Sequence, residues 1–107
     1  MPYIISKSWW PSDKTTEVVN KAFEVVPKNP PDPSLEEVVV QNAVKATDKG
    51  IMNITIFEVK KGKLEEALMR EQKIAVEYHD IAGFEYSLEV WNTAVEAFGF
   101  IGRKPPE

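Results

Sequence analysis

The chain has 107 residues, of which 43% are hydrophobic and 28% are charged, and its formal net charge is −4. This length fits a single domain, and the acidic balance argues against a nucleic-acid-binding surface, which needs a basic stripe to neutralise phosphates. No apolar run approaches the ~20 residues of a membrane span, and the N-terminus lacks the basic flank and apolar core of a signal peptide. We therefore expect a soluble cytoplasmic protein that binds neither nucleic acid nor membranes.

The residue types that are missing exclude several kinds of site. The chain has no Cys and a single His, which excludes disulfides, thiolate nucleophiles, iron–sulfur clusters and zinc sites of the cysteine or multi-histidine type within one chain. It also has no Gly-rich loop of the kind that binds phosphates or dinucleotides. We expect no cofactor and no metal.

The first part of the chain predicts a strand followed by a helix. Residues Tyr3 to Trp10 are rich in Tyr, Ile and Trp, as in strands, and Pro11 ends the run. Ser12 is the expected N-cap of the helix. The apolar residues of that helix recur at helical spacing: Val18, Val19, Ala22, Phe23 and Val26. The prolines from Pro27 onward mark residues 27–34 as a stiff surface connection.

The middle of the chain predicts a β-hairpin. Leu35 to Thr47 is rich in Val and Thr and lacks helical spacing, so it predicts a strand. Asp48-Lys49-Gly50 is a turn signal, because Gly adopts a positive φ without strain. Ile51 to Val59 alternates between apolar and polar residues and should pair back on the preceding strand.

The last part of the chain predicts helix, strand and short helix. Lys61-Gly62 opens a second helix that we expect to reach about Ile81. Residues 84–91 alternate and predict the last strand. Residues 93–96 carry a capping-box pattern, which predicts a short helix that ends at Gly102.

This order of elements predicts the fold class. Two consecutive β-α-β units joined by a hairpin are the sequence form of the ferredoxin-like fold. We therefore predict an α+β domain over residues 1–102, with a βαββαβ order, a four-stranded antiparallel sheet, two helices on one face and a short C-terminal helix. Residues 103–107 should form a frayed tail. The other face of the sheet is too apolar to be left in water and needs a cover.

Two stretches carry a resemblance to a known superfamily. VKKGKLEEAL (residues 59–68) and GFEYSLEVWNTAVEAF (residues 83–98) are similar to stretches of the dimeric α/β-barrel superfamily, which includes antibiotic-biosynthesis-type monooxygenases and many uncharacterised stress-related proteins. The resemblance covers about half the chain. It implies that ferredoxin-like sheets from two chains close into one barrel, often around a small-ligand cavity. The catalytic Asn, Trp and His sets of the monooxygenases do not match here position by position, so no catalytic role is carried over.

An alignment of the two halves of the chain at their helix entries sorts the strand residues into two faces. One face is mainly apolar, so we expect it to pack on the helices: Tyr3, Ile5, Lys7, Trp9, Met52, Ile54, Ile56 and Glu58. The opposite face, with Trp91 closing the same space, supplies the predicted ligand-binding residues: Ser6, Ser8, Trp10, Asn53, Thr55, Phe57 and Trp91. Small hydroxyls, an amide and aromatic rings are typical of a ligand cavity, but a plain dimer interface has the same composition and is the simpler interpretation.

Few titratable residues indicate chemistry. His79 lies near the end of the second predicted helix, where the helix dipole favours it, so we prefer a structural role over that of a general base or haem ligand. Glu71 lies in the apolar stripe of the same helix, and Lys7 lies on the predicted helix side of the first strand. Because an unpaired buried charge costs several kcal/mol, we predict that Lys7 meets Glu71 or Glu58.

Two function classes remain. The first is a binding or structural module, a homodimer that hides Ile4, Trp10 and Phe57 and holds a small, largely apolar or aromatic ligand. The alternative is a cofactor-independent monooxygenase-like enzyme acting on a small aromatic substrate, which should present a titratable group beside the aromatic residues inside the barrel. The predicted inner face offers no such group, so the binding or structural module ranks first, and whether the protein is an enzyme stays open.

Overall fold

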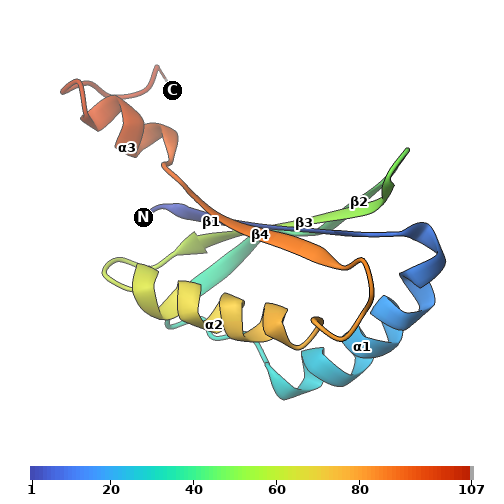
Figure 1. The fold of residues 1–107 in the computed structure, drawn as a ribbon. Helices are drawn as coiled ribbons and strands as arrows, with labels where there is room; N and C mark the ends of the chain where they lie inside the picture. Colours follow the sequence, from blue (N-terminus) through green and yellow to red (C-terminus); the bar gives the residue numbers. More distant parts are fainter. Residues whose placement is uncertain (107) are drawn as a thin grey trace.

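A computed structural model describes residues 1–106, and its fold is drawn in Figure 1. The regular elements follow the predicted order: β1 (Tyr3–Trp10), a short 3-10 turn (Ser12–Lys14), α1 (Thr15–Lys28), β2 (Glu36–Thr47), β3 (Gly50–Val59), α2 (Leu64–Val76), β4 (Glu85–Trp91) and α3 (Ala94–Gly99). The predicted α+β, ferredoxin-like order is therefore confirmed. Within the predicted C-terminal tail, Glu107 lies outside the described residues.

The four strands form one antiparallel sheet in the order β2-β3-β1-β4. β1 and β3 are central, and β2 and β4 are the edges. Figure 1 shows α1 and α2 on one side of the sheet and α3 on the other. Across residues 1–106, none of the helices is long and apolar enough to cross a membrane.

The helices and the sheet bury two separate apolar clusters. The first lies under α2 and contains Ile4, Leu35, Phe57, Val59 and Ala67. The second lies at the other end of the sheet and contains Trp10, Val18 and Ile81, with Ile51, Tyr78 and Phe84 packed against them. In this second cluster the aromatic rings stack in a row, with centroids 6.0 Å apart for Trp10 and Phe84 and 5.0 Å apart for Phe84 and Tyr78.

The turn between β2 and β3 packs directly against the end of β1. Gly50 has a φ of 123°, and a Cβ at this position would lie 2.1 Å from the carbonyl oxygen of Trp10. Only glycine allows so close an approach of two backbones. Gly50, predicted as part of the turn, therefore also allows the hairpin to approach the second apolar cluster closely.

The register of the sheet confirms the predicted grouping of residues into two faces and corrects the side on which each face lies. Ile4 pairs with Phe57, and both contact the cluster under α2. Ile5, Lys7 and Trp9 therefore lie on the side away from α1 and α2. The prediction was wrong because it gave the more apolar face to the helices. Both faces carry apolar residues, and the more apolar one is the face that the helices leave open.

Several element boundaries differ from the predictions. α2 ends at Val76 and not near Ile81, because the next three amide groups donate to carbonyls three residues back, at 3.1 Å each, and form turns. Ser12 lies in the 3-10 turn and is not a side-chain cap; its carbonyl accepts from Thr15 Oγ1 at 2.8 Å. α1 runs to Lys28, one residue past Pro27. At α3 the predicted capping box is present, but the helix ends at Gly99 and not at Gly102.

α1 leaves part of its apolar stripe uncovered. Val18 and Val25 are buried against the sheet side, whereas Val19, Phe23 and Val26 are exposed, Phe23 by 77%. Of the predicted stripe only Val18 is buried, and Val25, which the prediction left out, is the second buried residue of α1. This chain leaves apolar residues unpartnered on a helix flank as well as on one sheet face.

Candidate binding surface on the open face of the sheet

The face of the sheet opposite α1 and α2 carries a group of apolar side chains that neither of these helices covers. Its central strands contribute six apolar or aromatic side chains, all half-buried: Tyr3, Ile5, Trp9, Met52, Ile54 and Ile56. Along β1 and β3 they alternate with the residues of the helix side, so both faces of these two strands carry some apolar side chains. A sheet face of this kind is typical of a surface that packs against another layer.

A charged cluster lies on this open face where β1 meets β4. Lys7 Nζ lies 3.2 Å from Glu89 Oε2, and Trp91 Nε1 donates a hydrogen bond of 2.8 Å to Glu89 Oε1. Ser87 Oγ donates to Glu89 Oε2 at 3.4 Å. The hydrogen bond from Trp91, and then that from Lys7, lower the pKa of Glu89. Glu89 is thus an ionised acceptor and a weak base at neutral pH.

This cluster corrects the predicted ion pair. Lys7 meets neither Glu71 nor Glu58, because it lies on the open face and its partner there is Glu89. Glu71 is a buried residue of α2, and its cationic partner is Arg70 at 2.9 Å. The cluster was missed because it joins strands from opposite ends of the chain, although Ser87, Glu89 and Trp91 alternate along one strand.

α3 overhangs one end of the open face. It lies on the same side of the sheet as this face (Figure 1), and the ammonium group of Met1 fixes it by an ion pair of 2.7 Å to Glu96 Oε2. A shallow groove of about 370 Å³ separates α3 from the sheet, and Tyr3, Glu58 and Val95 are among its lining residues. No residue of α3 is buried, and Val95 is 67% exposed.

The predicted ligand-binding residues do not share one surface. Trp10 and Phe57 belong to the two buried clusters on the helix side. The register places four more residues on that same side: Ser6, Ser8, Asn53 and Thr55. Trp91 lies on the open face, opposite Tyr3 in the register. The predicted ligand-binding residues are therefore divided between the two faces, with only Trp91 beside the open surface, and their ligand-binding role stays a prediction.

His79 lies on the helix side, away from the open face. Its Nε2 lies 3.2 Å from the hydroxyl of Tyr86, and the two rings stack with centroids 5.6 Å apart. Gln72 Nε2 donates to the same hydroxyl at 2.6 Å. The contact of His79 thus joins the turn after α2 to β4, and that of Gln72 joins α2 itself to the same strand. Among residues 1–106, no group of three or more His, Asp or Glu side chains is placed to hold a metal ion.

In comparisons with known proteins, no family model, no curated protein and no solved structure matches this chain. The ferredoxin-like arrangement thus rests on the structure itself. Membership of the dimeric α/β-barrel superfamily stays a prediction from the resemblance.

Proposed function

We propose that this protein is a homodimeric binding module in which the open faces of two sheets pack against each other and enclose a small, largely apolar ligand. The observation that carries the proposal is the accessible surface of the single chain, 7364 Å². A monomer of 12.1 kDa is expected to expose about 6,000 Å². The excess of roughly 1,300 Å² exceeds the ~800 Å² that each partner buries in a standard interface.

The shape of the chain supports the same proposal. Its radius of gyration is 15.5 Å, whereas a compact domain of this length is expected to have about 13 Å. The molecule is only 18 Å across in its thinnest direction, against 48 Å in its longest. It is thus a sheet with helices on one side, and a second layer on the open face would complete it.

A second copy is the occupant that best suits this face. The face combines an apolar centre with charges of both signs, including Lys7, Glu58 and Glu89. A two-fold axis brings the same patch of both chains together, so a patch that carries both signs is complementary to itself. α3, which overhangs the sheet edge, would then flank the second copy. Trp9 and Trp91 supply aromatic faces on which a flat apolar ligand can stack.

One observation keeps the monooxygenase-like alternative as a second candidate. The open face carries titratable groups beside an aromatic one, namely Lys7 and Glu89 next to Trp91. A general base works best with a pKa near the working pH, and the pKa of Glu89 is lowered from its ordinary value. The binding function therefore ranks first.

Sedimentation equilibrium at micromolar concentration tests the proposal. We expect twice the 12.1 kDa of the single chain. Ile54→Lys places a charge in the centre of the open face and should give a folded monomer, whereas Met69→Lys, on the exposed side of α2, should leave the dimer intact. A wild-type monomer, or a dimer that Ile54→Lys does not affect, would contradict the proposed interface.

The ligand needs a separate measurement. Native mass spectrometry of protein purified from its own source should show a dimer with an added mass that disappears on denaturation. If every preparation shows a dimer without added mass, the proposed interface is supported and the proposed ligand is contradicted.

A further inference from the structure

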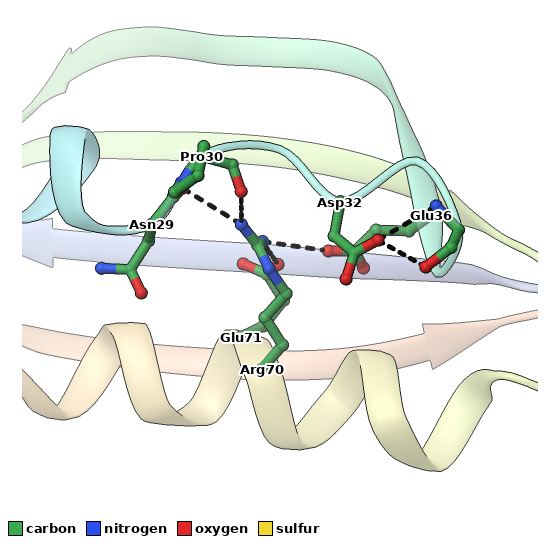
Figure 2. A network of polar contacts seen from close by, with 7 residues as sticks. Asn29, Pro30, Asp32, Glu36, Arg70 and Glu71 are labelled. Atoms are coloured by element: carbon green, nitrogen blue, oxygen red, sulfur yellow. Dashed lines mark hydrogen bonds and ion pairs between the residues drawn. The ribbon is translucent and has the colours of Figure 1, made fainter.

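A buried charged cluster lies where the connection between α1 and β2 crosses α2, on the helix side of the sheet. Figure 2 shows that its carboxyl groups come from β2 and α2. The side chain of Glu36, the first residue of β2, is 3% exposed, and that of Glu71 in α2 is 8% exposed. Neither belongs to the open face or to the proposed binding function.

Arg70 joins the three parts of the chain that meet here. Its Nη1 donates to Glu71 Oε2 at 2.9 Å and lies 3.5 Å from Glu36 Oε2. Its Nη2 donates to the backbone carbonyls of Asn29, at 3.1 Å, and Pro30. One guanidinium group thus ties α2 to the connection that leads from α1 to β2 (Figure 2).

The cluster has two buried carboxyl groups and one cation, so Arg70 can neutralise only one of them. It forms its good hydrogen bond with Glu71. As a carboxylate, Glu36 would have no donor in suitable geometry for either oxygen. A proton on Glu36 removes this deficit, because the carboxylic acid can then donate to Glu71.

The surroundings of Glu36 favour the protonated form. Burial first, and then the hydrogen bond to Glu71 and the charge of Glu71, raise the pKa of Glu36 to about 9, against the lowering effect of Arg70. Asp32 in the connection also repels the ionised form of Glu36 and so raises the pKa of Glu36 further. The hydrogen bond from the hydroxyl of Ser34 lowers the pKa of Asp32 and keeps Asp32 ionised. The β3 residue paired with Glu36 is Val59, which carries no charge.

We propose that one proton shared by Glu36 and Glu71 is a pH-dependent latch that holds the α1–β2 connection against α2, and that its loss at alkaline pH releases the connection. Ionised Glu36 would leave a buried net negative charge beside Asp32 and would compete with Glu71 for Arg70. Arg70 would then no longer hold the carbonyls of Asn29 and Pro30. The start of β2 would lose its attachment to α2.

The variant Glu36→Gln tests the proton. Its amide carbonyl can accept from Arg70 and its NH₂ group can donate to Glu71, as the protonated acid does. In the wild type, folding takes up one proton between the ordinary pKa of about 4.5 and the folded pKa of about 9. The unfolding constant at fixed protein concentration should therefore rise by up to about tenfold per pH unit in this range relative to Glu36→Gln.

Glu37→Gln is the matched control. Glu37 is the next residue, but it is exposed and pairs with Lys60 at 2.9 Å. This variant should keep the pH dependence of the wild type. If Glu36→Gln also keeps it, the shared proton is overturned.

Two further measurements separate a latch from a simple buried acid. In Glu71→Gln, Glu36 should be ionised and should pair with Arg70, so this variant should fold. The double variant Glu36→Gln/Glu71→Gln should unfold more readily than either single variant, because Arg70 then has no carboxylate partner. If the double variant is as stable as Glu36→Gln, the proposal that Arg70 needs one ionised carboxylate partner is overturned. In the wild type, amide hydrogen exchange corrected for its intrinsic rate should accelerate at alkaline pH at Leu35 and Glu36. The N–H groups of both residues donate to the backbone carbonyl of Asp32. Acceleration spread evenly over all strands would overturn the local release.

Discussion

The tandem tryptophans show how alternation along a strand sends neighbouring residues into different environments. Trp10 is buried between the sheet and the helices, where its Nε1 donates to Thr15 Oγ1 at 3.1 Å and its ring stacks on Phe84. Trp9 lies on the open face, where the register pairs it with Met52 and Glu85. The two indoles look alike in the sequence and have opposite roles in the fold.

Single substitutions should separate these two roles. Trp10→Ala removes a core aromatic residue and should lower the free energy of unfolding by roughly 3–5 kcal/mol. Trp9→Ala removes no part of either buried cluster, so its effect in the monomeric Ile54→Lys background should be less than half as large. Urea unfolding measures both. Equal losses for the two variants would contradict the assignment of faces.

The pKa of Glu89 gives a second prediction for a single residue. Because its pKa is lowered in the folded state, its contacts with Lys7 and Trp91 are present above the ordinary pKa and are lost as the pH falls through the lowered value. Trp91 fluorescence should therefore change only in acid below the ordinary carboxyl pKa of 4.5. Glu89→Gln, which cannot ionise, should remove that change, while Glu85→Gln on the same face should keep it.

Among the elements, α3 is joined to the domain most weakly. It contributes no buried residue, and the ion pair of Met1 with Glu96 holds it beside the sheet. An exposed ion pair contributes about 0–1 kcal/mol. The exposed apolar residues of α3, together with Phe100 and Ile101 in the following turn, are available for contact with a second chain.

A chain ending at Asn92 tests the role of α3. In the Ile54→Lys background, its free energy of unfolding should stay within about 1 kcal/mol of the full chain, since neither buried cluster is touched. In the wild-type background, the dimer of the shortened chain should be weaker, so that it dissociates at a higher protein concentration than the dimer of the full chain. A loss of several kcal/mol in the monomer would mean that α3 belongs to the core.

The elements themselves could be predicted because their signals are local. Strand alternation in 51–59 and the capping box of Thr93 and Glu96 depend on residues a few positions apart, and both are present in the structure. The end of α2 was misplaced because the turns after Val76 preserve an apolar spacing, with Tyr78 and Ile81 still packed in the core.

The site could not be predicted to the same extent, because it depends on what covers each face of the sheet. Apolarity identifies a surface that is buried but not the layer that buries it, so Ile54 and Ile56 were assigned to the helices. The contacts of Lys7 with Glu89 and of Glu36 with Arg70 join distant segments, and no spacing along the chain indicates them. The chemistry of both clusters became visible only with the register and the packing.

For the whole molecule, the uncovered sheet face, the overhanging α3 and the exposed stripe of α1 have a common physical meaning. Each is apolar surface that this chain does not bury on itself, and each adds to its large accessible area. Such surface lowers the stability of an isolated chain. Association would add to the stability of the folded state through mass action.

The midpoint of thermal unfolding should therefore depend on protein concentration. For a dimer that unfolds to two chains, each tenfold rise in concentration adds about 1.4 kcal/mol to the free energy of unfolding. With the usual unfolding entropy per residue over both chains, the midpoint should rise by roughly 3 °C per tenfold step. Ile54→Lys should remove this dependence and Met69→Lys should keep it. A wild-type midpoint that stays constant from micromolar to millimolar concentration would mean that the open face of the sheet stays uncovered in solution.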